Sequence, residues 1–218
     1  AIFGKYIPGK IWVILGRAGM VAKDKRELIK TSAISLKEQL VYLVIGLLTS
    51  FAILLFMPVN DWYLAVIFLT AAGLSLFLFS KKIHFWGELL FEKIFRKRIE
   101  IPFVNIRQSL PYAIILLILW LIWSVGFYLL CRSVYPDTQL VAAFIFPVSV
   151  SYGLLAIFLP GGIGVREGVM VLLLTSSGME PAMATTISVL SRIWFITGEI
   201  FIFSAAFIAK RKRKTFAN

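Results

Sequence analysis

The chain has 218 residues, of which 60% are hydrophobic, and its mean hydropathy is +0.89. Ordinary globular proteins are about 45–50% apolar, so this composition excludes a soluble domain. The 23 lysines and arginines outnumber 11 acidic residues and give a formal net charge of +12. They lie between apolar runs and form no soluble basic face, which excludes a nucleic-acid partner. The single cysteine excludes a disulfide framework and a thiolate metal site. We expect an all-α, polytopic integral membrane helix bundle.

The first 16 residues are apolar but broken by charges, Pro8 and Gly9, so they are too short for a complete span. The chain begins at Ala1, without an initiator methionine or a signal-peptide pattern. We expect one transmembrane domain over residues 1–218, and a fragment without its upstream helices is one explanation of this start.

About six apolar segments follow, and most are long enough to cross a hydrocarbon core of about 30 Å. We predict membrane helices over residues 39–57, 62–80, 110–131, 139–159, 163–177 and 182–209. Before the first of them, residues 17–38 form a basic loop. Within that loop, Ser32 or Ser35 is placed to cap a short helix.

The basic loop at residues 81–109 contains a different kind of helix. Ile83, Trp86, Leu90 and Ile94 recur at three- and four-residue steps, with charged side chains on another face. This pattern is typical of an amphipathic helix that lies on the membrane surface.

The distribution of charge predicts which side of the membrane each loop faces. Segments 17–38, 81–109 and the tail 210–218 hold 18 of the 23 basic residues, and the loops between them are mostly acidic. By the positive-inside rule the basic segments are cytoplasmic, where they face the anionic inner leaflet of the cell membrane.

The fourth and fifth segments are open to two interpretations. Residues 163–177 span only about 22 Å of helix, which is less than the hydrocarbon thickness. The two segments are therefore either two crossings or a re-entrant, broken pair, and charge counting does not separate these topologies.

A proline and three glycines interrupt the chain between these two segments. The residues are Pro160, Gly161, Gly162 and Gly164. Proline donates no N–H and glycine has no φ restriction, so the chain can turn sharply and present N–H groups as an anion-binding concavity. Arg166 follows where a helix N-terminus adds partial positive charge, and its planar fork suits phosphate. Glu167 either neutralises Arg166 or holds a cationic headgroup amine.

The last segment carries two further charges, Arg192 and Glu199, on nearly the same helix face. They are about 10 Å apart along the axis, so we expect partners from other helices, as pairs Arg192–Glu167 and Arg166–Glu199. The alternative is that these four charges are only interhelical struts.

Residues 6–11 repeat the pattern of residues 158–163: aromatic, aliphatic, Pro, Gly, any residue, Ile. Transporters often pair broken segments from two repeats around one site. A Pro-Gly pair is also a common end of an apolar helix, so the repeated pattern can arise by chance. The cations near the first copy, Lys10 and Arg17, have an alternative role as anchors at the membrane interface. The secondary site candidates are Pro8, Gly9, Lys10 and Arg17.

Residues 6–12 with Arg17, together with the string from Pro160 to Gly168, resemble the flippase-like transmembrane family. That family includes the membrane portion of bacterial lysylphosphatidylglycerol synthases and many standalone relatives. The resemblance covers most of the chain in order and extends to the final span with Arg192. Its longer members begin with further helices, and the synthases carry a soluble aminoacyl-transfer domain that has no counterpart here. The resemblance implies translocation or handling of lipid more than its synthesis.

We therefore expect a protein that binds and translocates a phospholipid or a lipid-linked substrate. The expected headgroup-binding residues are Gly161, Gly162, Gly164, Arg166, Glu167, Arg192 and Glu199. One alternative is an integral membrane transferase with Glu167 as its base, and another is a structural or regulatory subunit. The protein partners that we expect are a second copy of the chain, in a homo-oligomer, or a separate synthase. The sequence shows no nucleophile–base pair, acidic metal cluster or nucleotide-binding loop, so we expect no enzyme activity, metal or cofactor.

Overall fold

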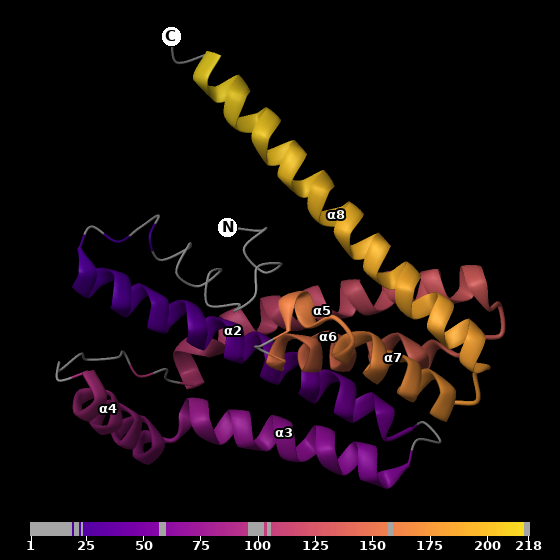
Figure 1. The fold of residues 1–218 in the computed structure, drawn as a ribbon, viewed down its shortest axis with the longest axis horizontal. Coiled ribbons are helices and arrows are strands. Elements are labelled where there is room, and N and C mark those ends of the chain that lie inside the picture. Colours follow the sequence, from indigo (N-terminus) through magenta and orange to yellow (C-terminus); the bar gives the residue numbers. More distant parts are fainter. Residues whose placement is uncertain are drawn as a thin grey trace.

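The computed structural model describes residues 24–56, 60–95, 106–156 and 159–215, together with residues 19, 22 and 103. Every regular element in these ranges is a helix, which confirms the all-α prediction (Figure 1). The elements are α2 (Lys25–Leu54), α3 (Asp61–Phe79), α4 (Lys81–Phe95), α5 (Ile106–Val134), the 3₁₀ helix η2 (Leu140–Phe144), α6 (Ile145–Leu155), the 3₁₀ turn η3 (Pro160–Gly162), α7 (Val165–Ser176) and α8 (Pro181–Thr215).

Four helices in the described part of the chain are long and apolar enough to cross a membrane. They are the α2 segment Glu27–Phe51, all of α3, the α5 segment Ser109–Val134 and the α8 segment Pro181–Ile208. Large apolar side chains such as Leu69, Ile122 and Phe201 are exposed on them, as expected for helices that face lipid. The prediction of a multi-pass membrane bundle is confirmed.

The basic segment before the first span is helical where the structure describes it. The expected loop over residues 17–38 and its cap at Ser32 or Ser35 are wrong for residues 25–38, because α2 runs through them without a break. The cap is Asp24, whose carboxylate accepts a hydrogen bond of 2.7 Å from the N–H of Glu27. Residues 25–38 contain good helix formers and neither Gly nor Pro, so nothing ends the helix there.

Close approach of α2 and α5 depends on a glycine. A Cβ at Gly46 would lie 2.7 Å from the Trp120 ring, so only a missing side chain lets the indole fit. The ring stacks on Tyr42 at a centroid distance of 4.4 Å, and its N–H donates to the Tyr42 carbonyl at 3.0 Å. The core of the bundle therefore forms around a buried Trp120 whose polar atom is satisfied.

Helix α4 confirms the amphipathic helix predicted inside residues 81–109. It contacts α3 and lies at an angle to it beyond the end of that helix (Figure 1). Phe85 and Trp86 are exposed, and so are the cations Lys81, Lys82 and Lys93. Its position on a membrane surface stays a prediction.

Helices α6 and α7 form a short hairpin around the glycine-rich turn. They pack against each other (Figure 1), and their 11 and 12 residues correspond to about 17 and 18 Å, less than a 30 Å hydrocarbon core. The 3₁₀ helix η2 runs directly into α6 and extends the first leg to Leu140–Leu155. The loop before η2 and the loop after α7 line one hollow of about 170 Å³, so both open ends of the hairpin lie at the same end of the bundle. Whether the pair is re-entrant or crosses the membrane twice stays a prediction.

Candidate functional site

The glycine-rich turn is shaped by contact with α6. Gly161, Gly162 and Gly164 have φ values of 62°, 66° and 86°, a conformation that other residues rarely adopt. A Cβ at Gly162 would lie 2.3 Å from the carbonyl oxygen of Gly153. A Cβ at Gly153 would in turn lie 2.8 Å from that of Arg166. The glycines thus let the turn press directly onto α6.

The backbone N–H groups of the turn are already engaged in part. The N–H of Gly162 donates to the carbonyl of Leu159 at 3.0 Å, which closes the turn. The N–H of Gly164 donates to the carboxylate of Glu167 at 2.7 Å, so α7 is capped by its own first-turn acid. Two of the N–H groups that we expected to bind an anion therefore already have acceptors within the protein. Of these two, the N–H of Gly164 is the one that binds a charged side chain.

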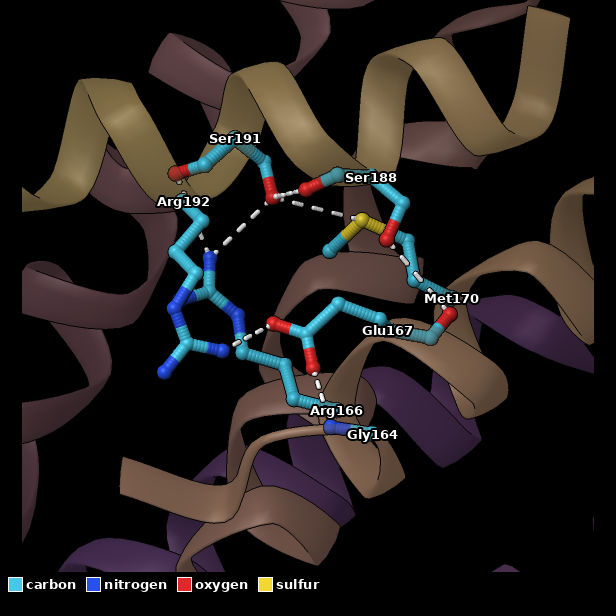
Figure 2. Close-up of polar contacts among 7 residues, drawn as sticks. All are labelled: Gly164, Arg166, Glu167, Met170, Ser188, Ser191 and Arg192. Carbon is cyan, nitrogen blue, oxygen red and sulfur yellow. Dashed lines mark hydrogen bonds and ion pairs between the residues drawn. The ribbon is translucent and has the colours of Figure 1, made fainter. Parts of the chain in front are cut away.

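The predicted pair Arg192–Glu167 is confirmed. One Glu167 carboxylate oxygen binds the Arg192 guanidinium from α8, while the other accepts from Gly164 (Figure 2). The side chains of Arg192 and Glu167 are 21% and 22% exposed. The pair therefore connects the hairpin to the last membrane span and can still be reached from outside the protein.

Arg166 has a different environment from Arg192. It is 8% exposed, and one guanidinium nitrogen donates to both the carbonyl and the hydroxyl of Ser191, at 3.3 and 3.1 Å. Its guanidinium carbon lies 5.3 Å from the ring centroids of both Phe146 and Phe195, a cation–π arrangement. Arg166 is thus built into the contact of α7 with α6 and α8. The predicted pair Arg166–Glu199 stays a prediction.

Two serines on α8 complete the site. Ser191 donates to the carbonyl of Ser188 at 2.7 Å while it accepts from Arg166, and Ser188 donates to the carbonyl of Glu167 at 3.5 Å (Figure 2). No role was predicted for either serine from the sequence. Ser188 lies three residues before Ser191 and four before Arg192, the spacing of neighbours on one face of a helix, and this signal was present in the sequence.

The remaining predicted residues stay predictions. Glu199 lies seven residues beyond Arg192 on α8 and has an interaction partner. The secondary candidates Pro8, Gly9, Lys10 and Arg17 lie outside the described residues. Within the described ranges no group of three or more His, Cys, Asp and Glu side chains is placed to hold a metal ion.

Comparison with known proteins adds one match. The family described as the lysylphosphatidylglycerol synthase TM region matches residues 1–197. This range includes the glycine-rich turn, Arg166, Glu167 and Arg192, and it ends before Glu199. No curated protein and no solved structure matches the chain significantly.

Proposed function

We propose that this chain, which belongs to the lysylphosphatidylglycerol synthase TM region family, binds lipid and moves it across the membrane. In this proposal an anionic headgroup binds beside the glycine-rich turn while the acyl chains stay in the bilayer. The family relates the chain to the handling of membrane lipids, and the geometry of the turn supports a headgroup site within it. The proposed activity makes and breaks no covalent bond.

The observation that carries the proposal is the ion pair Arg192–Glu167, in which Arg192 lies near the middle of the candidate membrane span Pro181–Ile208. A charged side chain near the membrane centre costs about 2.5–3.5 kcal/mol on insertion scales, so such residues are rarely placed there without a role. Arg192 is accessible and its guanidinium can bind a phosphate through two parallel hydrogen bonds. Arg166 is less suited to that role because its guanidinium is buried against Ser191 and two aromatic rings.

We also propose that the basic segments face the cytoplasm of the cell or inner membrane. Helix α4 supports this orientation, because it exposes Phe85 and Trp86 together with three lysines. Aromatic side chains prefer the membrane interface, and each lysine near an anionic leaflet contributes about 1 kcal/mol of attraction. The anionic inner leaflet is then the surface on which α4 lies.

Translocation of fluorescent phospholipid in vesicles tests the proposed function. We compare vesicles that contain the purified chain with protein-free vesicles, and the chain with its Arg192→Gln variant. Arg132→Gln is the matched control, because Arg132 is exposed at the end of α5 and outside the site. We expect Arg192→Gln to lose at least tenfold in rate and Arg132→Gln to keep the rate.

Two results would contradict the proposal. Translocation by the unmodified chain that is no faster than in protein-free vesicles would refute the function. A folded Arg192→Gln variant with an unchanged rate would refute the site while leaving the function standing.

A further inference from the structure

The carboxylate of Glu167 stands where an anionic ligand of this site would bind. One oxygen accepts from the backbone N–H of Gly164 at 2.7 Å, and the other binds the guanidinium of Arg192 (Figure 2). These two donors come from different parts of the fold, the turn of the hairpin and the last span. They are of the kind that binds phosphate in proteins, an oriented backbone N–H and an arginine. The protein's own acid therefore fills the anion position.

We propose that Glu167 is an internal competitor, which the phosphate of a phosphodiester lipid must displace from Arg192 and Gly164 before it binds. This inference rests on the proposed function, because it assumes that an anionic headgroup binds at the turn. It changes the role of Glu167 from a headgroup ligand to an occupant that compensates the charge of Arg192 while the site is empty. Removal of the Glu167 charge then strengthens phosphate binding.

The exposure of the pair supports displacement. Arg192 and Glu167 are 21% and 22% exposed, so a ligand can reach both without unfolding of the bundle. A displaced Glu167 side chain has rotatable bonds that allow it to turn toward water, whereas the Gly164 N–H is fixed by the backbone. In the empty site the Glu167 carboxylate compensates the charge of Arg192, which would be costly to leave partly buried without a partner.

The rest of the hairpin contact does not depend on this ion pair. Arg166 binds Ser191 on α8, and Ser188 donates to the backbone carbonyl of Glu167 at 3.5 Å. These contacts use neither the Glu167 carboxylate nor the Arg192 guanidinium. The carboxylate can therefore leave its two donors while α7 and α8 stay in contact. Displacement is a local exchange of one anion for another.

Lipid binding to the purified full chain in detergent tests the inference, measured by native mass spectrometry titration. The probes are dioleoyl phosphatidylglycerol, dioleoylglycerol as the same lipid without phosphate, and glycerol 3-phosphate as a soluble phosphate. We expect Glu167→Gln to bind the phospholipid at least tenfold more tightly than the unmodified chain. We expect no change for dioleoylglycerol, and weak binding of glycerol 3-phosphate if the acyl chains are required.

Two further variants separate competition from a general effect of charge. Glu167→Asp keeps the charge but is one methylene shorter, so it reaches the two donors less well and should give an intermediate gain. Glu180→Gln removes one negative charge from the exposed residue before α8 and should leave the affinity unchanged. If Glu167→Gln fails to fold, the phospholipid affinity of Glu167→Asp tests the inference, and we again expect tighter binding than by the unmodified chain.

The outcomes distinguish the inference from the proposed function. Phosphate-dependent binding by the unmodified chain, with equal or weaker binding by Glu167→Gln and Glu167→Asp, overturns the inference alone. An equal gain in Glu180→Gln also overturns it, because charge and not competition would be the cause. Equal binding of phospholipid and dioleoylglycerol by every variant overturns the headgroup site and with it the inference. Tight binding of glycerol 3-phosphate supports the competitor but shows that the ligand is a free phosphate.

Discussion

Gly162 lies so close to Gly153 that a Cβ on it would come within 2.3 Å of the Gly153 carbonyl oxygen. The two residues belong to the turn and to the helix before it, and their contact is backbone against backbone. Gly153 is equally restricted, because its own Cβ position lies 2.8 Å from the Cβ of Arg166. The glycine-rich turn, the buried arginine and α6 are therefore fitted to one another at a place where no side chain has room.

Gly162→Ala should destabilise the protein. The left-handed φ of 66° costs a residue with a side chain about 1–2 kcal/mol, and overpacking against Gly153 adds about 1–3 kcal/mol. We expect the free energy of unfolding to fall by about 2–5 kcal/mol, measured by denaturation in detergent. Gly168→Ala in α7 is the control, because nothing lies within 4 Å of its Cβ position, and it should be neutral or slightly stabilising. Equal stability of the two variants would show that the turn moves away from α6 without cost.

A double-mutant cycle on Glu167 and Arg192 should reveal a favourable coupling in the lipid-free protein. Glu167→Gln leaves a partly buried cation and Arg192→Met a partly buried anion, and we expect each to cost about 1–3 kcal/mol at this degree of exposure. The double variant leaves no uncompensated charge and should recover at least about 1 kcal/mol of the summed loss. The measurement is unfolding in detergent with all lipid removed. Strictly additive losses would mean that the two side chains do not interact in the folded protein.

Substitution of Arg166 should affect folding more than ligand affinity. Arg166→Lys keeps the charge but loses the fork that donates to Ser191 and the flat face between Phe146 and Phe195. We expect a loss of about 2 kcal/mol in unfolding free energy, and Ser191→Ala should cost about 1–3 kcal/mol because it removes the hydroxyl, one of the two Ser191 acceptors of Arg166. Among molecules that remain folded, phospholipid affinity should change less than threefold. Arg132→Lys, on the exposed end of α5, is the control for the stability measurement.

A tenfold loss of affinity in folded Arg166→Lys, with normal stability, would contradict this assignment. It would place the guanidinium in contact with the ligand, as the sequence analysis expected. Arg166→Ala alone does not separate the two roles, because it removes the charge, the hydrogen bonds and the ring contacts at once.

The sequence predicted the helices because length, hydropathy and turn residues act locally. The spans at α3, α5 and α8 appear within a few residues of their predicted limits, and the amphipathic pattern correctly predicted α4. Polarity was a poor guide at residues 25–38, where charged helix formers continue α2 beyond the apolar segment. Hydropathy predicts which segment of a helix lies in the membrane, and it does not predict how far the helix extends beyond that segment.

The sequence predicted one contact of this region but not the surroundings of each side chain. The spacing along α8 correctly suggested that Arg192 pairs with Glu167. The contrast between a buried Arg166 and an accessible Arg192 depends on Phe146, Phe195 and the packing of three helices, which no local pattern records. The role of Gly153 was also invisible, because it follows from a backbone contact across the turn.

Labelling of single introduced cysteines with a membrane-impermeant maleimide tests the membrane topology. The background is Cys131→Ala, because Cys131 is buried in α5 and can be replaced by a smaller apolar residue. By the charge distribution we expect Asp137→Cys to react from outside the cell and Glu92→Cys only after the membrane is permeabilised. Ile163→Cys, at the exposed turn, should not react from the cytoplasmic side, because a hairpin of about 18 Å does not cross a 30 Å core.

The pattern of reactivity separates the two topologies and the two orientations. If residues 139–159 and 163–177 were complete crossings, Ile163→Cys would react only from the side on which Glu92→Cys reacts. If the orientation were inverted, Asp137→Cys and Glu92→Cys would exchange sides while Ile163→Cys stayed unreactive from the Glu92 side. Irregular backbone is tolerated in a membrane only within protein or a water-filled cavity. A re-entrant turn would therefore be reached by a short aqueous or protein-lined path that opens to one face of the membrane only. The charged pair beside that turn would then face the path, and a headgroup could reach Arg192 from one leaflet before the acyl chains reorient.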